Sequence, residues 1–452
     1  MEGMQGWLVG LGGARLRARV EDLGDQFWLR PALVVASCIG LGVLATWYDE
    51  ATGDTWKVLS TGWFYSGSGE GARSLLSAVA SSTIGVAGTI FSITIAALSL
   101  ASGQMGPRLI RNFVRDPRNQ VALGIFLGTF AYALTVLRTV RTGDEGAFVP
   151  DLGVTGAMAL ALVCVGTLVW FVHHVATSIN VETVVGAVHE DLVAAIGSDA
   201  LGELPLLFPS EPVRGEAVAA SGSGFLQAVD ADALADWAAE RRVEVALRVR
   251  PGAFVPHGAP VAIISASTED AREVVDRALT FGPRQAALQD LEYPVRQLNE
   301  IAVRALSPGI NDPFTAGSVL DRFGDALCRL AKRHLPRGAV ARDGRIVLRL
   351  DVVDYDGLCD AMFHTVRQNG SGSAYVLIRL LEVLAHTAEV ERSPERLATL
   401  RRHADLAIGV ARDGVSDPAG LEDCERRHRA FAASVDMADA PAAAATYGPR
   451  RG

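Results

Sequence analysis

Long apolar segments dominate the first part of the chain. Four of them are almost free of charged side chains: Phe27 to Tyr48, Ala72 to Ser102, Val121 to Val140 and Leu152 to Val172. Each reaches about 20 residues, enough for a helix to cross a hydrocarbon core of roughly 30 Å. The first segment starts well inside the chain and has no small-residue cleavage site after it, so we expect it to stay embedded. The pattern predicts four transmembrane helices.

The pattern of apolar and polar positions changes after about residue 215. Short alternating runs bounded by Gly and Pro, such as "VEVALRVRPGAFVPHGAPVAII", predict strands, and the rest of the chain shows the three-to-four-residue spacing of amphipathic helices. We therefore predict a polytopic α-helical membrane domain of four transmembrane helices, followed by a cytoplasmic α+β domain with a small β-subdomain and a helical bundle.

Shifts in pattern and composition also place the domain boundaries. The predicted order is an N-terminal cytoplasmic segment (1–26), the transmembrane domain (27–176), a connecting helix and linker (177–214), the β-rich subdomain (215–270), the mainly helical cytoplasmic domain (271–436) and a disordered tail (437–452).

Basic residues near the helix ends set the orientation in the membrane. One group precedes or opens the first span, and a second lies between the second and third spans: Arg15, Arg17, Arg19 and Arg30, then Arg108, Arg111, Arg115 and Arg118. The other loops carry mainly acidic residues. By the positive-inside rule both termini are expected in the cytoplasm.

The composition is typical of a membrane protein and argues against some classes of binding partner. The mean hydropathy of +0.24 is high for a soluble chain. The formal net charge of -9 comes mainly from the part beyond the spans, which argues against nucleic acid as a partner. The bilayer with its anionic headgroups is the expected partner instead.

Small residues form a stripe along the second span. They recur every three or four positions, which places them on one helix face: Ser81, Gly85, Gly88, Ser92, Ala96, Ser99 and Gly103. No charged residue occurs between Arg73 and Arg108. The stripe is interpreted either as a helix-packing seam or, when several copies surround an axis, as the lining of a polar path for a small ion.

The second basic group has two interpretations of its own. If the segment is helical, Arg108, Arg111, Arg115 and Arg118 share a face, which fits topological anchoring on anionic headgroups. The alternative is a ring of arginines at the cytoplasmic mouth of a pore, where it would attract anions.

The stretch "ALSPGINDPFTA" combines a helix stop with a helix start. Ser307 and Gly309 belong to the stop, Asp312 is placed to cap the next helix, and Asn311 and Thr315 flank it. The residues are explained by capping alone, or by capping together with a bound ion or an interface. The upstream stretch "FGPRQAALQD" supplies further polar groups, at Arg284, Gln289 and Asp290.

Known catalytic and metal-binding motifs are absent from the sequence. There is no GxSxG elbow, no phosphate-binding loop and no zinc-spaced Cys/His cluster, and the HExxH-like start at His189-Glu190 has Val193 where the second ligand belongs. We expect no enzyme activity, no cofactor and no metal. An enzyme on the cytoplasmic domain is a third, less favoured alternative.

Several phrases carry a family resemblance. "VRPGAFVPHGAP", "QDLEYPVRQLNEIAVRALSPGINDPFTA" and the order of the spans resemble bacterial predicted inner-membrane proteins grouped as domain of unknown function 2254. The resemblance runs from about Trp28 to Val410. It implies an inner-membrane protein with four spans and a cytoplasmic domain, and it implies no reaction. The family phrase "FGxxRTxxQD" differs here, with Gln285 and Ala286 in that stretch.

These observations favour an oligomeric, channel-like or transport protein of the inner membrane whose cytoplasmic domain assembles or regulates it. The homo-oligomer and the permeant ion are both part of this hypothesis. The alternative is a non-conducting, membrane-anchored envelope scaffold or sensor.

Overall fold

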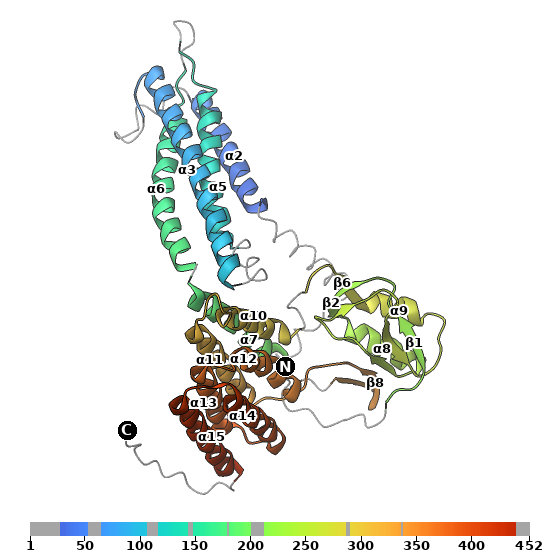
Figure 1. Cartoon of the computed structure of the whole chain (residues 1–452). Coiled ribbons are helices and arrows are strands. Elements are labelled where there is room, and N and C mark those ends of the chain that lie inside the picture. Colours follow the sequence, from blue (N-terminus) through green and yellow to red (C-terminus); the bar gives the residue numbers. More distant parts are fainter. Residues whose placement is uncertain are drawn as a thin grey trace. The chain divides into compact units, whose positions relative to one another are not determined.

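The computed structural model divides the chain into two compact units, Met1–Asn180 and Val181–Gly452 (Figure 1). The structure describes residues 28–52, 65–105, 116–142, 148–178, 180–199, 212–285, 290–335 and 338–439.

Four long helices make up the described part of the first unit: α2 (Leu29–Thr52), α3 (Gly69–Met105), α5 (Pro117–Leu137) and α6 (Asp151–Ser178). All four are long and apolar enough to cross a membrane. The predicted set of four spans is therefore confirmed.

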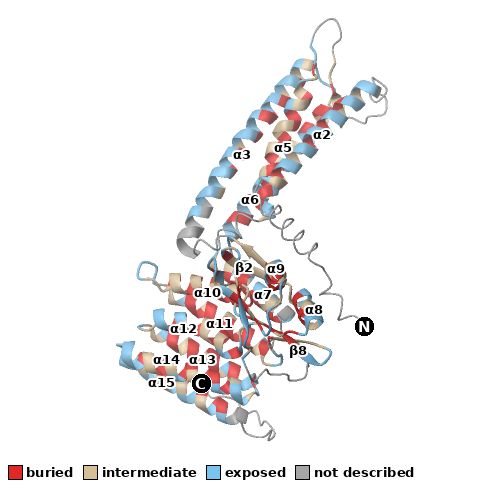
Figure 2. Ribbon diagram, turned by 90° about the vertical axis from the view of Figure 1, so that its right-hand side faces the viewer, coloured by how far each residue is buried: buried red, intermediate tan, exposed pale blue. Residues whose placement is uncertain are grey.

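Helix α5 is the central helix of this unit. It packs against α2, α3 and α6, and half of its most apolar stretch is buried, against 22% to 28% for the other three. Figure 2 shows the buried positions following α5, while the outer sides of α2 and α3 are exposed. Glycine permits one of these contacts, because a Cβ at Gly128 would meet the Cys38 sulfur of α2 at 2.7 Å.

Polar contacts join α2, α5 and α6 near the start of α6. The Asp49 carboxylate accepts hydrogen bonds from the backbone N–H groups of Leu152 (3.3 Å) and Gly153 (3.1 Å), which the first turn of a helix leaves without internal partners. The Tyr132 hydroxyl donates to the Gly153 carbonyl at 3.1 Å. Tyr132 fits only because Gly156 has no side chain there.

The second unit contains a β-part with two sheets. A five-stranded sheet has the order β1-β5-β3-β8-β7, and a three-stranded sheet the order β4-β2-β6. The strands are β1 (Glu216–Ala219), β2 (Gly224–Val229), β3 (Val245–Leu247), β4 (Phe254–Val255), β5 (Pro260–Ile264), β6 (Leu279–Gly282), β7 (Ala339–Arg342) and β8 (Arg345–Arg349). Helices α8 (Ala231–Arg241) and α9 (Ala271–Ala278) pack on them around a shared core that includes Leu226, Leu234 and Val275.

One hairpin of this β-part comes from much later in the chain. Strand β8 pairs in parallel with β3, with Val245 opposite Leu348. The hairpin β7–β8 therefore interrupts the helical region and returns to the sheet. The predicted subdomain 215–270 contains β1 to β5 and α8, but not this hairpin.

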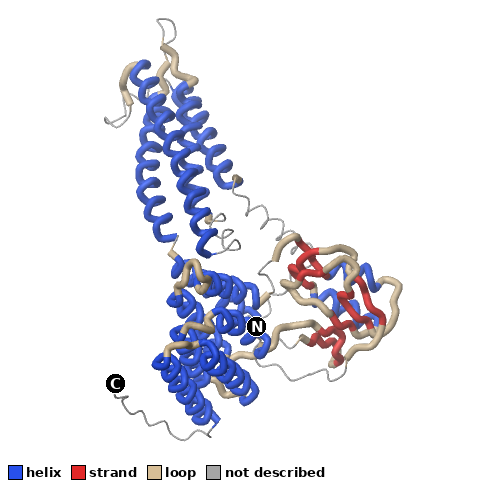
Figure 3. The backbone as a smooth tube through the Cα atoms, viewed as in Figure 1, coloured by secondary structure: helices blue, strands red, loops and turns tan. Residues whose placement is uncertain are grey.

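The helical part consists of α7 (Val181–Asp199), α10 (Glu292–Ala305), α11 (Pro313–Leu330), α12 (Tyr355–Asn369), α13 (Ala374–Val390), α14 (Pro394–Gly414) and α15 (Pro418–Asp439). Figure 3 shows these helices gathered apart from the strands, beside which α8 and α9 lie. Helix α7 packs against α10 and α11. The predicted fold class, membrane helices followed by a mixed α and β region, is thus confirmed.

We expect Gly156→Ala to destabilise the first unit by about 1 to 3 kcal/mol, because the added methyl group would overlap the buried Tyr132 hydroxyl. Thermal unfolding of the detergent-solubilised protein measures the effect. Gly166→Ala in the same helix is the control, since open space surrounds that position. Tyr132→Phe in the Gly156→Ala background should restore part of the loss, and no restoration would contradict the overlap.

Candidate functional site

The small-residue stripe lies on the exposed side of α3. Six of its seven members are exposed (Ser81, Gly85, Gly88, Ser92, Ala96 and Ser99), while the side-chain environment at Gly103 lies outside the described part of the helix. The buried positions of α3 are Ala72, Leu76, Val79, Ala80, Thr83, Ala87 and Ile90. At 3.6 residues per turn the two sets occupy opposite sides of the helix. The stripe is therefore not the seam that holds α3 to its own bundle.

Several hydroxyl groups of α3 donate hydrogen bonds to carbonyl groups of their own helix. Ser92 donates to the Gly88 carbonyl at 3.0 Å, and Thr89 donates to the Gly85 carbonyl at 3.2 Å. These bonds satisfy the hydroxyl hydrogens without a partner from another segment. The same side chains can then face another helix, lipid or water.

Most of the basic face lies outside the described residues, namely Arg108, Arg111 and Arg115. Arg118 is described and is exposed in the first turn of α5. The N-cap of α5 is Asp116, whose carboxylate accepts from the Arg118 backbone N–H at 2.9 Å and contacts His174 Nε2 of α6 at 2.7 Å. This contact joins α6 to the start of α5, and the His174 ring stacks on Trp170 of its own helix.

The loop between α10 and α11 is a capping structure. Asp312 accepts from the backbone N–H groups of Phe314 (3.1 Å) and Thr315 (3.2 Å), and its second oxygen accepts from the Thr315 hydroxyl at 2.6 Å. Asn311 has a φ of 52°, a left-handed conformation that Asn adopts more easily than most residues. Ser307 donates to the Arg304 carbonyl at 2.6 Å.

Asp312 therefore caps α11 and Asn311 forms the turn before it, and the interpretation that adds a bound ion or an interface stays a prediction. Gly309 is exposed with open space around it. Ile310 and Phe314 are exposed at 44% and 69%, so the loop presents apolar side chains next to its polar cap.

The upstream polar stretch ties α10 to the β-part. Asp290 is buried and pairs with Arg296, while Glu292 pairs with Arg250 at 2.9 Å. Burial raises the pKa of Asp290, Glu292 acts in the same direction, and Arg296 opposes them. A Cβ at Gly252 would overlap the Asp290 carboxylate, so this glycine lets the turn after Arg250 approach α10.

The rest of that stretch is partly described. Gln285 donates to the Gly252 carbonyl at 3.0 Å, and the Arg284 carbonyl accepts from Gln227 at 2.9 Å. Ala286 and Gln289 lie outside the described residues. These contacts connect the segment that precedes α10 to the turn at Gly252 and to strand β2.

His189 belongs to the contact between α7 and α11. Its Nε2 lies 2.8 Å from Asp325 Oδ2, which also accepts from Arg329 Nε at 2.7 Å. Burial lowers the pKa of His189, and Arg322 and Arg329 act in the same direction, while Asp325 opposes them.

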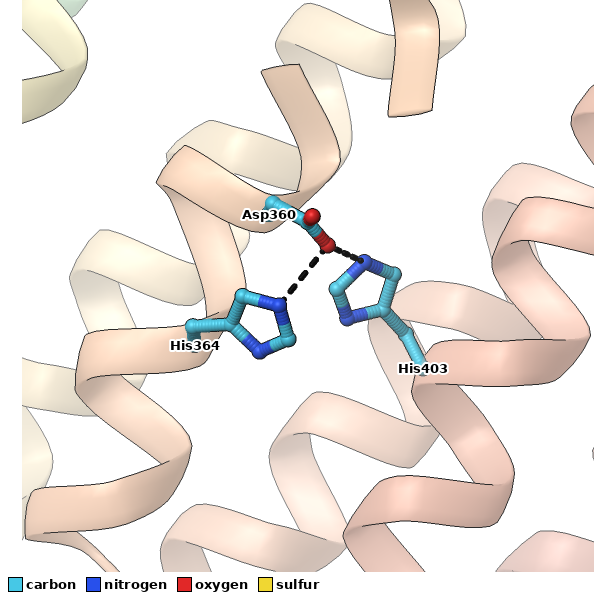
Figure 4. A group of neighbouring side chains, drawn as sticks. All are labelled: Asp360, His364 and His403. Atoms are coloured by element: carbon cyan, nitrogen blue, oxygen red, sulfur yellow. Dashed lines mark ion pairs between the residues drawn. The ribbon is translucent and has the colours of Figure 1, made fainter. Parts of the chain in front are cut away.

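A cluster that the sequence reasoning missed joins α12 to α14. It consists of Asp360, His364 and His403, called the His–Asp cluster below (Figure 4). Asp360 Oδ1 lies 2.8 Å from His364 Nε2 and 3.2 Å from His403 Nε2. One ligand atom from each residue lies within 4.8 Å of the other two.

Two arginines surround the His–Asp cluster. Arg402 donates to Asp360 Oδ1 at 2.6 Å and to Asp356 Oδ1 at 2.8 Å, and the same nitrogen lies 3.3 Å from His403 Nε2. Arg367 lies 3.2 Å from His364 Nδ1. A guanidinium group has only donors, so this Nδ1 accepts and the ring proton sits on Nε2, facing Asp360.

Burial differs strongly within the cluster. The His403 side chain is fully buried, whereas those of His364 and Asp360 are exposed at 33% and 36%. Burial lowers the pKa of His403 to about 4, with Arg402 acting in the same direction. His403 is therefore uncharged at neutral pH.

A cavity of about 780 Å³ opens beside the cluster, between the ends of α11 and α13 and the starts of α12 and α14. Its lining includes Lys332, Tyr355, Asp356, Glu391, Arg396 and Thr399. Asp356 lies one helical turn before Asp360, and Thr399 one turn before His403. Thr399 donates to Asp356 at 3.0 Å, so the cavity wall and the cluster are continuous.

Only part of this cluster has a local signal in the sequence. Asp360 and His364 are four residues apart, which puts them on one helix face. His403 belongs to another helix, and the contact between α12 and α14 is not readable from spacing.

Comparison with known proteins identifies the family. The model of a family described as "Predicted membrane protein (DUF2254)" matches residues 24–386. The chain belongs to this family. Uncharacterized proteins of Mycobacterium tuberculosis (strain CDC 1551 / Oshkosh) and Mycobacterium bovis are each 31% identical to it over 418 residues, covering 89% of this chain and 79% of theirs. No solved structure matches the chain.

The family assignment agrees with the four membrane spans. It makes this chain a membrane protein in contact with the lipid bilayer.

We expect Asn311→Ala to destabilise the second unit by about 1 kcal/mol, because alanine lacks the local hydrogen bonding that eases a left-handed conformation. Asn311→Gly should be close to neutral, since glycine adopts positive φ freely. Asp312→Ala should cost about 1 to 2 kcal/mol through the lost cap. Thermal unfolding of the full chain tests all three, and a loss well above 3 kcal/mol for Asp312→Ala would contradict a purely capping role.

We expect acidification to weaken the contact between α7 and α11. The pKa of His189 is lowered in the folded chain from its ordinary 6.5, so the unfolded chain takes up the proton first as the pH falls. The stability present above pH 6.5 is then lost as the pH falls toward the lowered value. The melting temperature of His189→Gln should depend less on pH between 7.5 and 5.5 than that of the parent protein. His428→Gln, at an exposed pair with Asp405, is the control, and an equal flattening there would contradict the assignment.

Proposed function

We propose that this chain is an oligomeric, channel-like protein of the bacterial inner membrane, with α3 of each copy facing the symmetry axis. Both termini and the second unit then lie in the cytoplasm, as the distribution of arginines favours. The second unit assembles or regulates the membrane part and carries no catalytic step in this proposal.

The observation that carries the proposal is the contrast between the outer surfaces of the helices. The outer sides of α2 and α6 present large apolar side chains, such as Leu44 (60% exposed) and Leu162 (74% exposed), which suit lipid. The exposed side of α3 carries a continuous stripe of small residues, such as Gly85, Gly88 and Ser92, between larger apolar side chains. Small residues let a second helix approach closely, where dispersion contacts between backbones stabilise association.

Chemistry along α3 supports a polar path rather than a charged one. Between Arg73 and Arg108 the sequence holds no charged residue, so this helix offers no carboxylate relay. The Ser92 hydroxyl has already donated its hydrogen to the helix, and its oxygen remains able to accept from water or to face a cation. A narrow pore lined by such groups is uncharged and wettable.

The flanks of the stripe are apolar. Ile84, Phe91 and Ile95 are 41% to 49% exposed and follow one side of the small residues. Around an axis, these side chains would pack against the neighbouring copy, while the small residues line the centre. In a simple helix pair, the small residues themselves would form the contact.

We expect Ser92→Leu to abolish ion flux while leaving the oligomer intact, because a larger apolar side chain would close and dewet a narrow path. Single-channel recording in lipid bilayers gives the flux, and native mass spectrometry gives the oligomeric state. Val165→Leu on the exposed side of α6 (62% exposed) is the matched control and should change neither.

Two outcomes would refute the channel. A monomeric parent protein, or a parent oligomer without conductance in all ions and pH values tested, excludes it. Loss of assembly in Ser92→Leu would assign the stripe to packing, which is the outcome expected of a non-conducting envelope scaffold or sensor.

A further inference from the structure

We propose that Asp360, His364 and His403 bind a divalent transition-metal ion, with Zn²⁺ the best match. This site goes beyond the proposed channel and does not depend on it. It also departs from the expectation drawn from sequence motifs alone.

The donor set fits this class of metal. Zn²⁺ in proteins takes imidazole nitrogens and carboxylate oxygens at about 2.0 to 2.2 Å, usually with tetrahedral geometry. With bonds of that length, ligand atoms around a tetrahedral ion lie about 3.3 to 3.6 Å apart. Asp360 Oδ1 lies 3.2 Å from His403 Nε2, close to this spacing, and 2.8 Å from His364 Nε2, so this second contact must lengthen when an ion binds. Three protein ligands would leave a fourth position to water.

The framework also holds the three donors in place. Asp360 and His364 are one turn apart on α12, and His403 comes from the packed face of α14. The His403 ring makes an edge contact with Phe363, which also packs against Phe323. Little ordering of the chain is then needed when an ion binds.

A cation already lies among these donors. The Arg402 guanidinium contacts Asp360 and lies 3.3 Å from His403 Nε2, so it competes directly with a metal ion. Its side chain is 37% exposed and already bonds to Asp356 at 2.8 Å. Arg402 can therefore stay paired with Asp356 when a metal ion replaces it at Asp360.

Binding also requires a change of tautomer at His364. Ligation through Nε2 places the remaining ring proton on Nδ1, which now accepts from Arg367. Arg367 must then move away from the ring. Arg402 and Arg367 both oppose binding of the metal ion, so these two side chains lower the affinity of the cluster for it.

The ion has an open path to the cluster. Asp360 and His364 are partly exposed, and Asp356 lines the neighbouring cavity. An ion can reach Asp360 and His364 first and then the buried His403.

The test uses the full-length, detergent-solubilised protein without a histidine tag, and Zn²⁺ as the probe. Isothermal titration calorimetry should give one ion per chain for the parent protein. His364→Ala and Asp360→Asn should each weaken binding by more than about tenfold. Arg402→Met should strengthen it, because the competing cation is gone while the aliphatic part of the side chain is kept.

His428→Ala is the matched control. His428 also pairs with an aspartate, Asp405, at 2.8 Å, and in the described part of the chain that pair belongs to no group of three ligands. The control should bind Zn²⁺ as the parent does. Titration with Co²⁺ adds a spectroscopic readout, since a tetrahedral site gives a strong visible absorption that His403→Gln should remove or shift.

The assignment is overturned by any of three results: no Zn²⁺ binding by the parent protein, unchanged binding in both His364→Ala and Asp360→Asn, or weaker binding in Arg402→Met. Melting temperatures without metal show whether each variant is folded. Because His364 and Asp360 lie at the partly exposed side of the cluster, their variants keep the test valid if His403→Gln fails to fold. Channel recordings are independent of all these measurements.

Discussion

The absence of water from the bilayer interior is the constraint on which the first unit depends. Every polar group there must find its partner within protein. Several hydroxyl groups of α3 meet this by donating to carbonyl groups of their own helix, and the Asp49 carboxylate accepts from free N–H groups at the start of α6. The bilayer environment also helps to interpret the small residues on the exposed side of α3. Lipid chains pack equally well against leucine, so glycine and serine on the exposed side of α3 are better explained by another helix or a polar path than by lipid.

In the second unit, a β-part is attached to a helical part. A covalent link and an ion network do this together. Arg250, Glu292, Arg296 and Asp290 connect the turn before β4 to the start of α10, and Gly252 provides the space for that approach. Asp290 and Glu292 are largely buried in this network, so removing one of their arginine partners would leave a carboxylate without a counter-charge.

Features set by local spacing could be predicted, and features set by long-range pairing could not. The four spans follow from apolar length alone. Asp312 could be assigned as a helix cap because the capping signal lies within three residues of it. The left-handed conformation of Asn311 could not be predicted from spacing. Three other features depend on residues far apart in the chain: the pairing of β3 with β8, the outward direction of the α3 stripe, and the meeting of His403 with Asp360 and His364. The last brings together two helices with α13 between them in sequence, and no periodicity encodes that contact.

The late hairpin has a consequence for how the chain folds. Strand β3 is complete about one hundred residues before β8 is synthesised, so during translation β3 stays an unpaired sheet edge while α10 and α11 emerge. Such an edge can pair with another chain. A fragment that ends before β7 would keep this edge permanently, and its sheet would lose both β8 and β7. The β-part is therefore continuous in space but not in the gene, and no single cut in the coding sequence releases it whole.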